Sequence, residues 1–256
     1  PATVVVSFQN GFNIERIAKY VPLKQIIGGV PNYTSALVDP GHLEFTAEGW
    51  AHIGEMDGTT TDRLRHLEWL LSRLTTVEVI TNIVGEIWAK QAHMCMIVMT
   101  ALVDGPISDI LAHERCRRMG AVIVREAIQV AKAAGVTVSE KMQIYDAKTP
   151  EETRRLMKYL EDMGARWSHR RPDREKLVKK ASGIWWDIVY RKRKSETTEL
   201  AGAVVNKAKE LGVPVPANER LVEMIYEIED GKRKLGWHNI DELESYMNSV
   251  GAVLRI

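Results

Sequence analysis

The stretch NIVGEIWAKQAHMCMIVMTALVDG, residues 82–105, decides the fold of this chain. It carries a single lysine, Lys90, followed by the longest apolar run of the sequence, residues 94–103, which only Thr100 interrupts. The run is too short to cross a bilayer, which requires about 20 apolar residues. We therefore expect a buried helix of a soluble domain, with Glu86 in its charged first turn.

Lys90 lies about one turn before the fully apolar part of this helix. A lysine at such a position often lays its stem along apolar surface and keeps its ammonium group in water. The alternative is that the ammonium extends from the edge of the core into a cleft and acts there on a ligand. The residues by themselves leave both interpretations open.

Composition narrows the class of protein. At 256 residues the chain suffices for one large domain or two small ones. The formal net charge is +1, so no global field draws the chain toward nucleic acid or a membrane. The two cysteines give no disulfide framework, and the seven histidines show no metal-ligand spacing. We expect a reduced, cytoplasmic protein without a metal site and without nucleic-acid or membrane partners.

The first 58 residues have the pattern of a small α/β region. The β-branched run at residues 3–7 is typical of a buried strand in a parallel sheet. Turn signals at Pro40-Gly41 and Glu48-Gly49 separate further strands. The expected elements are strands at residues 3–7, 25–29, 43–46 and 51–54, and a short helix at residues 13–20.

The periodicity becomes helical after residue 61. Leucines 64, 67, 70, 71 and 74 fall on one stripe of a helix. Thr149-Pro150-Glu151-Glu152 combines an N-cap, a first-turn proline and a capping box. We expect Asn218 to cap the next-to-last helix, and Asn239 or Asp241 to begin the last one. The other expected segments are an extended piece at 77–81 and helices at 62–74, 112–134, 149–164, 173–190, 195–211 and 219–230.

Few polar positions stand out as candidates for chemistry. Asn10 follows the first strand, where open α/β sheets collect ligands, although Asn-Gly also simply makes a tight turn. Glu196 lies in a first helical turn, where a carboxylate usually complements the helix dipole. Basic residues at 170–180 and 191–194 form a solvated face or attract an anion, and Trp185-Trp186 packs in the core or lines a ligand. The sequence contains no H-E-x-x-H, no G-x-S-x-G and no G-x-G-x-x-G.

Taken in order, several segments resemble the ketopantoate reductase (2-dehydropantoate 2-reductase) family. Each motif is weak by itself, and their shared order carries the resemblance, which extends from residue 4 to about residue 230. The segments are Gln9-Asn10-Gly11, the stretch from Gly28 through Ala36 to Pro40-Gly41, Trp88-x-Lys90, Thr100-Ala101-Leu102, Asp187, Ser195-Glu196, residues 202–205 and residues 210–219.

The resemblance implies an NADPH-dependent reduction of a 2-oxo acid, or a related ketone, to the hydroxy compound. It assigns Lys90 as the proton donor to the carbonyl oxygen, and Asn10 and Glu196 as residues that hold cofactor and substrate. This agrees with the chemistry, because a desolvated ammonium stabilises a developing alkoxide and supplies its proton. The family also implies a homodimer.

The sequence departs from the family at the substrate-binding positions. Met94 and Val98 occupy the places of asparagines that follow the lysine by one and two turns. Gly183 occupies the place of a serine, with Ser182 one position earlier. We therefore expect Met94, Val98, Ser182 and Gly183 to face a more apolar or bulkier oxo compound than ketopantoate.

The expected architecture is mainly α and has two parts. Residues 1–58 correspond to the C-terminal part of a dinucleotide-binding α/β domain, a partial Rossmann-type remnant. Residues 59–256 form a multi-helix substrate and dimerisation domain, similar to the C-terminal domain of 6-phosphogluconate dehydrogenase. Because these 256 residues carry no glycine-rich phosphate turn, we expect them alone to bind NADPH no more tightly than about millimolar. The alternative function is a non-catalytic helical interaction or dimerisation module descended from such an enzyme.

Overall fold

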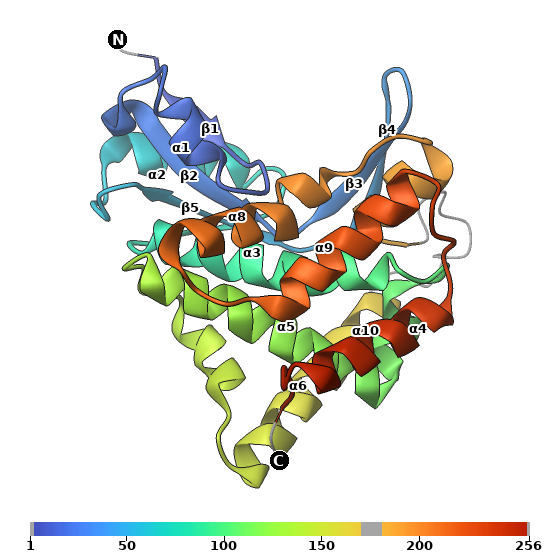
Figure 1. Ribbon diagram of the computed structural model, residues 1–256. Helices are drawn as coiled ribbons and strands as arrows, with labels where there is room; N and C mark the ends of the chain where they lie inside the picture. The colour runs from blue at the N-terminus through green and yellow to red at the C-terminus, as the bar shows by residue number, and fades with distance from the viewer. Residues whose placement is uncertain (1–2, 170–180, 255–256) are drawn as a thin grey trace. The chain divides into compact units, whose positions relative to one another are not determined.

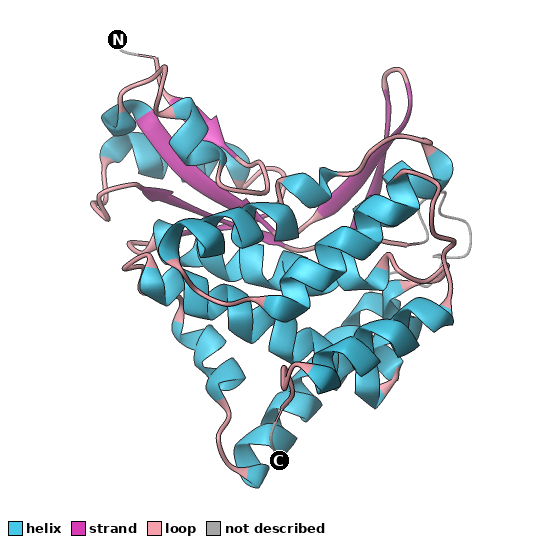
Figure 2. Cartoon of the chain, in the orientation of Figure 1, coloured by secondary structure: helices cyan, strands magenta, loops and turns pink. Residues whose placement is uncertain are grey.

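The computed structural model describes residues 3–169 and 181–254 of the chain. Helices predominate, and the strands among these residues all precede the helix that carries Lys90 (Figures 1 and 2). The prediction of a mainly helical chain with a small N-terminal sheet is confirmed. Two compact units are present, one of Pro1–Lys90 with Val136–Ser139 and one of Gln91–Gly135 with Glu140–Ile256. The predicted division into residues 1–58 and 59–256 stays a prediction.

The first unit is built on a mixed sheet of four strands in the order β1-β2-β5-β6. Parallel pairs join β1 to β2 and β5 to β6, and an antiparallel pair joins β2 to β5. A separate antiparallel hairpin consists of β3 and β4. The expected strands are confirmed, β3 is an addition, and β4 pairs with β3 and not with β5. The bounds are β1 (Val5–Ser7), β2 (Ile26–Pro31), β3 (Thr34–Asp39), β4 (His42–Ala47), β5 (Trp50–Glu55) and β6 (Thr76–Val79).

One face of this sheet packs against α2 (Asp62–Leu71), which follows β5. Thr61 caps the helix by accepting a hydrogen bond from the backbone N–H of Leu64. Leu64 is fully buried in a cluster with Ile27 and Ile53 of the sheet, and Leu67 and Leu71 pack against it. The predicted leucine stripe is therefore correct in part: Leu70 and Leu74 are about half exposed (53% and 58%) and lie outside the cluster.

The opposite face of the sheet receives the first turns of α3 (Ile83–Thr100). Gly28 and Gly54 lie opposite one another in the β2–β5 register. A β-carbon at either position would come within 2.7 Å of Ile83. The pair of glycines thus lets the start of α3 approach the sheet closely, because no side chains stand between them. This contact fixes where the helix begins, and so the direction in which it carries Lys90.

The second unit consists of the rest of α3 and the helices after it. The predicted helix at 112–134 is confirmed as α5. A short additional helix, α4, precedes it, and the two meet at His113, which is the C-cap of α4 and the N-cap of α5. The predicted stop at Gly164 was wrong: the helix continues, because this glycine lets it pass close to Leu111. The bounds are α4 (Ile107–Ala112), α5 (Glu114–Ala133), α6 (Pro150–His169), α7 (Gly183–Trp185), α8 (Ala201–Leu211), α9 (Pro216–Glu229) and α10 (Trp237–Ser249). The short α1 (Asn13–Ile17) belongs to the first unit.

Of the two predicted N-caps at Thr149 and Asn218, the structure confirms the first and not the second. The Thr149 capping box is confirmed, since Glu152 accepts from the backbone of Thr149 and Thr149 Oγ1 accepts from Glu152. Asn218 is not a cap, because α9 already begins at Pro216. Its buried side chain instead donates to Glu126, which also accepts the backbone N–H groups of Ala217 and Asn218 at 3.0 Å. A carboxylate from α5 therefore caps α9 from outside the helix.

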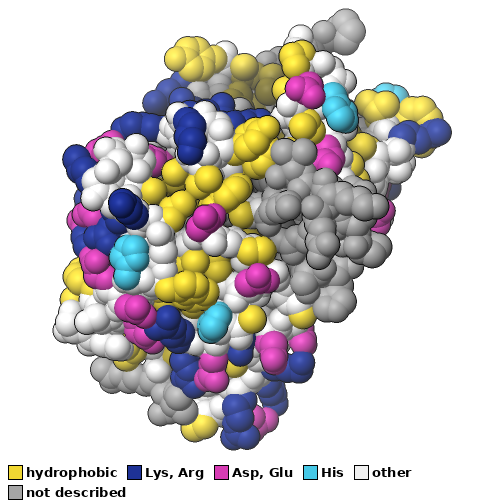
Figure 3. All heavy atoms as spheres, turned by 90° about the vertical axis from the view of Figure 1, so that its right-hand side faces the viewer, with side chains coloured by type: hydrophobic (Ala, Val, Ile, Leu, Met, Phe, Trp, Pro, Cys, Tyr) yellow, Lys and Arg dark blue, Asp and Glu magenta, His cyan; other side chains and the backbone are white. Residues whose placement is uncertain are grey.

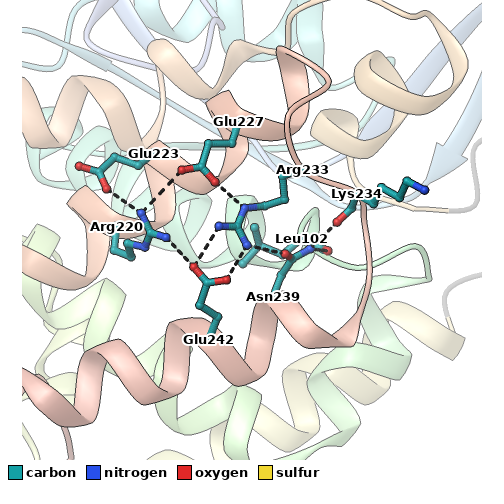
Figure 4. A network of polar contacts seen from close by, with 8 residues as sticks. All are labelled: Leu102, Arg220, Glu223, Glu227, Arg233, Lys234, Asn239 and Glu242. Atoms are coloured by element: carbon teal, nitrogen blue, oxygen red, sulfur yellow. Dashed lines mark hydrogen bonds and ion pairs between the residues drawn. The ribbon is translucent and has the colours of Figure 1, made fainter.

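A polar network joins α9 and α10 to the residues just after α3 (Figure 4). Arg233 donates to Glu227, Glu242 and Asn239, and Arg220 donates to Glu242. Asn239 is fully buried and donates to the carbonyl oxygens of Leu102 and Lys234, both at 2.9 Å. Neither Asn239 nor Asp241 is the N-cap of α10, since that helix begins at Trp237. Buried hydrogen bonds to main-chain carbonyls hold the last two helices in place.

The surface matches the balanced composition. On the face drawn in Figure 3, acidic and basic side chains are interspersed and do not form a single-sign field. Among the described residues, no helix is both long and apolar enough to cross a membrane. Nor do these residues contain a group of three histidine, cysteine or acidic side chains suited to a metal ion. The predicted helix over residues 173–180 and the basic residues at 170–180 lie outside the described residues.

Candidate functional site

The position of Lys90 follows from the side-chain alternation of β2. Gly28 and Val30 point to the face on which α3 packs, and the next residue of the same parity is Asn32, just beyond the strand. From Ile83, opposite Gly28, the helix runs two turns to Lys90. There the ammonium Nζ donates a hydrogen bond to Asn32 Oδ1 at 3.3 Å, and both side chains are half-buried. Lys90 is therefore neither fully exposed nor sealed in the core.

Asn32 was missed in the sequence, although a signal for it existed. The period of two places it on the same face of the sheet as Gly28 and Val30, and the packing of α3 on that face completes the prediction. A lysine ammonium can only donate hydrogen bonds, so the amide must present its oxygen to Lys90. The contact fixes the orientation of the amide as well as the position of the ammonium.

A buried histidine lies beside the first turn of α3. His52, on β5, is 4% exposed and stacks on Trp50 with ring centroids 4.0 Å apart. Its Nδ1 lies 3.4 Å from Glu86 of α3, and its Nε2 lies 3.2 Å from Glu78 of β6. Glu86 precedes Lys90 by four residues, the spacing at which side chains share one face of a helix. The lysine thus follows a polar cluster anchored in the sheet.

The segment around Asn10 lies near the same part of α3. Asn10 is half-buried and follows β1, and its carbonyl accepts a hydrogen bond from the side chain of Asn13. The ring of Phe12 lies 4.3 Å from the ring of Trp88, centroid to centroid. This contact packs the segment after β1 against α3. Trp88 and Lys90 are two residues apart on the helix and so point to different sides of it, and a shared site of Asn10 and Lys90 stays a prediction. The tight turn is also present, since Gly11 has a φ of 86°.

In the second unit, Met94 and Val98 continue α3 beyond Lys90. Met94 is half-buried, and Val98 is fully buried. His93, between them and Lys90, hydrogen-bonds the hydroxyl of the buried Tyr145 at 2.9 Å. Only apolar side chains stand at the two positions where asparagines were expected from the resemblance. Neither side chain can donate a hydrogen bond, and Val98 has no exposed surface, so its predicted contact with a substrate stays a prediction.

Ser182 and Gly183 form the start of α7. Ser182 is 3% exposed, and its Oγ caps the helix by accepting from the backbone N–H of Trp185 at 3.1 Å. The helix then widens into a π-helical turn, Trp186–Tyr190. Such turns are frequent at functional sites. Trp186 is 4% exposed and stacks on Tyr190 at 3.9 Å, and its indole N–H has no hydrogen-bond partner among the described residues.

Glu196 lies at the start of a short 3-10 turn, Glu196–Thr198, and is exposed. The turn is held from both sides. Ser195 donates through its backbone N–H and its hydroxyl to Glu229 of α9, at 2.9 and 2.6 Å. Gln91, which is 2% exposed, donates to the carbonyl oxygens of Glu199 and Leu200 at 2.9 and 2.8 Å. The Glu196 turn is therefore fastened to α3 by the residue that follows Lys90 in the chain.

The basic run beside Glu196 is largely paired within the protein. Arg191 and Arg193 both contact Asp187, at 3.4 and 2.9 Å, and Lys194 lies 3.4 Å from Asp230. These carboxylates neutralise much of the positive charge of residues 191–194. Lys192 has a left-handed backbone with a φ of 52°. The exposed and internally paired run agrees with a solvated face, and its attraction for an anion stays a prediction.

The grouping of Asn10, Lys90 and Glu196 in one site stays a prediction, and the structure adds two contacts that the sequence did not indicate. In the first unit Asn32 binds the ammonium of Lys90. In the second unit Gln91 binds the Glu196 turn. Gln91 carried no signal in the sequence, because a buried glutamine that binds distant carbonyl oxygens has no local pattern.

The chain has a small α/β unit and a multi-helix unit, and a half-buried lysine lies on the helix that leads from one to the other. This arrangement agrees with the class of oxidoreductases that the resemblance predicted, and comparison with known families identifies the family. Residues 82–229 match the family described as "Ketopantoate reductase PanE/ApbA C terminal", and residues 1–58 match "Ketopantoate reductase PanE/ApbA". The chain belongs to the ketopantoate reductase family, as the resemblance predicted.

Individual relatives agree with this assignment. The chain is 29% identical over 237 residues to the 2-dehydropantoate 2-reductase of Archaeoglobus fulgidus, covering 90% of this chain and 69% of the relative. It is 25% identical over 227 residues to the enzyme of the same name from Streptococcus pyogenes serotype M6, covering 88% and 66%. The chain therefore spans about two thirds of the length of these curated relatives.

Solved structures share the fold. A D-mandelate dehydrogenase in complex with NADH has a TM-score of 0.72 and 21% identity, covering 90% of this chain and 71% of that one. The same dehydrogenase with NADH and anilino(oxo)acetate has a TM-score of 0.69 and 20% identity, covering 90% and 69%. A dimeric ketopantoate reductase from Staphylococcus aureus has a TM-score of 0.63 and 17% identity, covering 90% and 69%.

Proposed function

We propose that this chain is the substrate-binding and proton-donating part of a nicotinamide-dependent reductase that converts a 2-oxo acid to the 2-hydroxy acid. The observation that carries the proposal is the half-buried ammonium of Lys90, held by Asn32 within a chain that belongs to the ketopantoate reductase family. Lys90 would be the proton donor. A snorkelling surface lysine needs no fixed acceptor at its tip, so the contact with the half-buried Asn32 favours the catalytic interpretation.

The nicotinamide cofactor, NADPH in this proposal, would be held by Asn10 and Glu196. Asn10 suits this role because its half-buried amide follows a strand with a parallel neighbour, and open α/β sheets bind ligands at such strand ends. Glu196 suits it because its carboxylate is exposed on a turn that Gln91 and Glu229 hold in place. The bound cofactor supplies the hydride.

The contribution of the chain to the reaction is proton transfer and charge stabilisation. As the carbonyl carbon of the substrate is reduced, negative charge develops on its oxygen. The ammonium of Lys90 would stabilise this charge and deliver its proton to that oxygen. The chemical step then leaves a neutral amine at Lys90, which regains a proton from solvent before the next turnover.

We further propose a substrate that is bulkier or more apolar than ketopantoate. Met94 and Val98 offer no hydrogen bonds where polar groups are expected, and Ser182 uses its hydroxyl as a cap at the start of the Gly183 turn. An unpaired polar group in a buried site costs about 1–3 kcal/mol, so a hydroxylated substrate would bind poorly. The fold likeness to a D-mandelate dehydrogenase, which was solved with anilino(oxo)acetate, supports testing aromatic oxo acids. We also propose a homodimer, supported by the dimeric relative.

Turnover with paired substrates tests the proposal. The active protein is assayed with NADPH and with NADH against ketopantoate and a phenyl-substituted 2-oxo acid. We expect oxidation of the cofactor and a higher kcat/KM for the aromatic acid. Absence of turnover with every oxo acid and both cofactors would reject the reductase and favour the non-catalytic interaction module.

A further inference from the structure

We infer that Asn32 is the positioning residue of Lys90: it holds the ammonium at one place and thereby sets how readily that group gives up its proton. The inference rests on the proposed function, since it explains how the proton donor is presented. It concerns two residues of the first unit, and their contact is described directly, from Lys90 Nζ to Asn32 Oδ1 at 3.3 Å.

A positioning residue must itself be held in place, and the backbone of Asn32 is. Its N–H donates to the carbonyl oxygen of Trp50 at 2.7 Å, which continues the β2–β5 ladder by one residue. Gly49 packs against its carbonyl so closely that a β-carbon there would lie 2.0 Å from the oxygen. Thr75 in turn donates to the carbonyl of Gly49 at 2.8 Å. Asn32 thus projects from a rigid strand end.

A lysine side chain without such a contact samples many rotamers, since four rotatable bonds separate Nζ from the backbone. One hydrogen bond from a fixed acceptor removes much of that freedom before a substrate arrives, which is the meaning of preorganisation. An amide oxygen is well suited to the task. It accepts from the ammonium but carries no full charge, so it orients the proton donor without neutralising it.

The identity of the acceptor also affects proton transfer. A neutral amide stabilises the protonated lysine modestly, whereas a carboxylate at the same place would stabilise it strongly and hold back its proton. Removal of the acceptor should have the opposite effect. Replacements of Asn32 by alanine and by aspartate are therefore expected to change the behaviour of Lys90 in opposite directions, which mere loosening of the fold would not do.

The first experiment measures Lys90 itself and needs no turnover. The 256-residue chain is treated with limiting acetic anhydride over a series of pH values, and acetylation of Lys90 is quantified by peptide mass spectrometry. The exposed Lys209 serves as the internal reference. Only the unprotonated amine reacts, so Asn32→Ala should raise the rate at Lys90 about two- to tenfold, the range for one ordinary hydrogen bond, because this contact is half-buried and long at 3.3 Å. Asn32→Asp should lower it.

The matched control is Asn248→Ala, because Asn248 is an exposed asparagine on the last helix. It should leave the rate at Lys90 unchanged. Rates at Lys90 that match the wild type in both Asn32 variants would overturn the inference. So would an increase in both variants, because this would indicate general loosening and not a specific contact.

The second experiment separates this inference from the proposed function. In the active protein, Asn32→Ala should lower kcat about tenfold and change KM little, since it affects the proton donor more than substrate binding. If Lys90→Met keeps full turnover, the proposed role of Lys90 fails, although the acetylation result still establishes the contact. If Lys90→Met abolishes turnover and Asn32→Ala leaves kcat unchanged, the proposed function stands and the positioning role is lost.

Discussion

Asn239 offers the sharpest test of what holds the helical unit together. Its side chain is fully buried, donates to the carbonyl oxygens of Leu102 and Lys234, and accepts from Arg233 at 2.9 Å (Figure 4). Replacement by aspartate keeps the size and shape of the side chain but replaces the amide NH₂ by oxygen. Two donated hydrogen bonds are lost, and an oxygen then faces two carbonyl oxygens.

The expected cost follows from these contacts. Each buried group left without a partner costs about 1–3 kcal/mol. The carbonyl oxygen of Leu102 still accepts a hydrogen bond from the backbone N–H of Gly236 at 2.9 Å. The cost of removing its bond to Asn239 therefore lies at the low end of this range. The new charge gains attraction to Arg233, which already contacts Glu227 and Glu242. We therefore expect Asn239→Asp to lower the free energy of unfolding by about 2–4 kcal/mol at neutral pH.

The assay is urea unfolding followed by circular dichroism, with Asn248→Asp as the control. Asn248 lies on the same helix, α10, but is exposed, so the same chemical change there should cost less than about 0.5 kcal/mol. Equal slopes of free energy against urea in the two variants would show that the folded states are equally compact. If the two variants were equally stable, the buried amide of Asn239 would contribute nothing that an exposed asparagine does not, contrary to this expectation.

Three further outcomes are expected. Hydrogen bonds from Arg233 and then Arg220 lower the pKa of Glu242 to about 2 from its usual 4.5. A carboxyl group with a lowered pKa stabilises the folded state at pH values above its ordinary pKa, and this stabilisation is lost as the pH falls to the lowered pKa. The free energy of unfolding should therefore decrease between about pH 4.5 and pH 2, and Glu242→Gln should make this decrease smaller. Glu126→Ala should lower the free energy of unfolding by about 3–5 kcal/mol, measured in urea, because it removes the acceptor of two backbone N–H groups, those of Ala217 and Asn218, and one of the two acceptors of the Asn218 side chain. A cost under about 1 kcal/mol would contradict the capping role. Gly49→Ala should displace Asn32 and raise acetylation of Lys90, and an unchanged rate would show that the glycine does not restrain Asn32.

The elements that the sequence predicted well are those in which a local signal and the tertiary contacts agree. The apolar run after Lys90 is the buried helix α3, and the Thr149 capping box begins α6. Glycine was the less reliable signal. Gly164 was expected to stop a helix, but it lies mid-helix beside Leu111, where its small size matters and not its backbone freedom. Sequence alone does not distinguish these two uses of glycine.

The polar residues that were misassigned share one cause. Asn218 and Asn239 were expected to cap helices because asparagine favours that position. Each is instead buried in the first turn of its helix and bonded to a carbonyl of a distant segment, Ile123 or Leu102. Such partners are fixed by packing and leave no mark in the neighbouring sequence. The same holds for Gln91, which binds residues 199 and 200.

In the candidate site, too, some residues could be predicted from the sequence and others became evident only in the structure. Lys90, Asn10 and Glu196 came from the resemblance, and the structure adds the physical supports around them. Asn32 follows from the alternation of β2, but only once α3 is known to pack on that face of the sheet. The packing of α3 on this face follows from the register that places Gly28 opposite Gly54. That register results from the pairing of two strands, which the pattern of a single sequence does not specify.

The central claim is that Lys90 donates the proton in reduction of a 2-oxo acid, and its most direct test is turnover of the Lys90→Met variant. Methionine keeps an unbranched stem on the helix, so the melting temperature should remain close to that of the wild type. Lys209→Met provides the matched control at an exposed position. We expect kcat to fall by about 10²–10⁴ in Lys90→Met and to be unchanged in Lys209→Met. A folded Lys90→Met variant that turns over the oxo acid at the wild-type rate would contradict it.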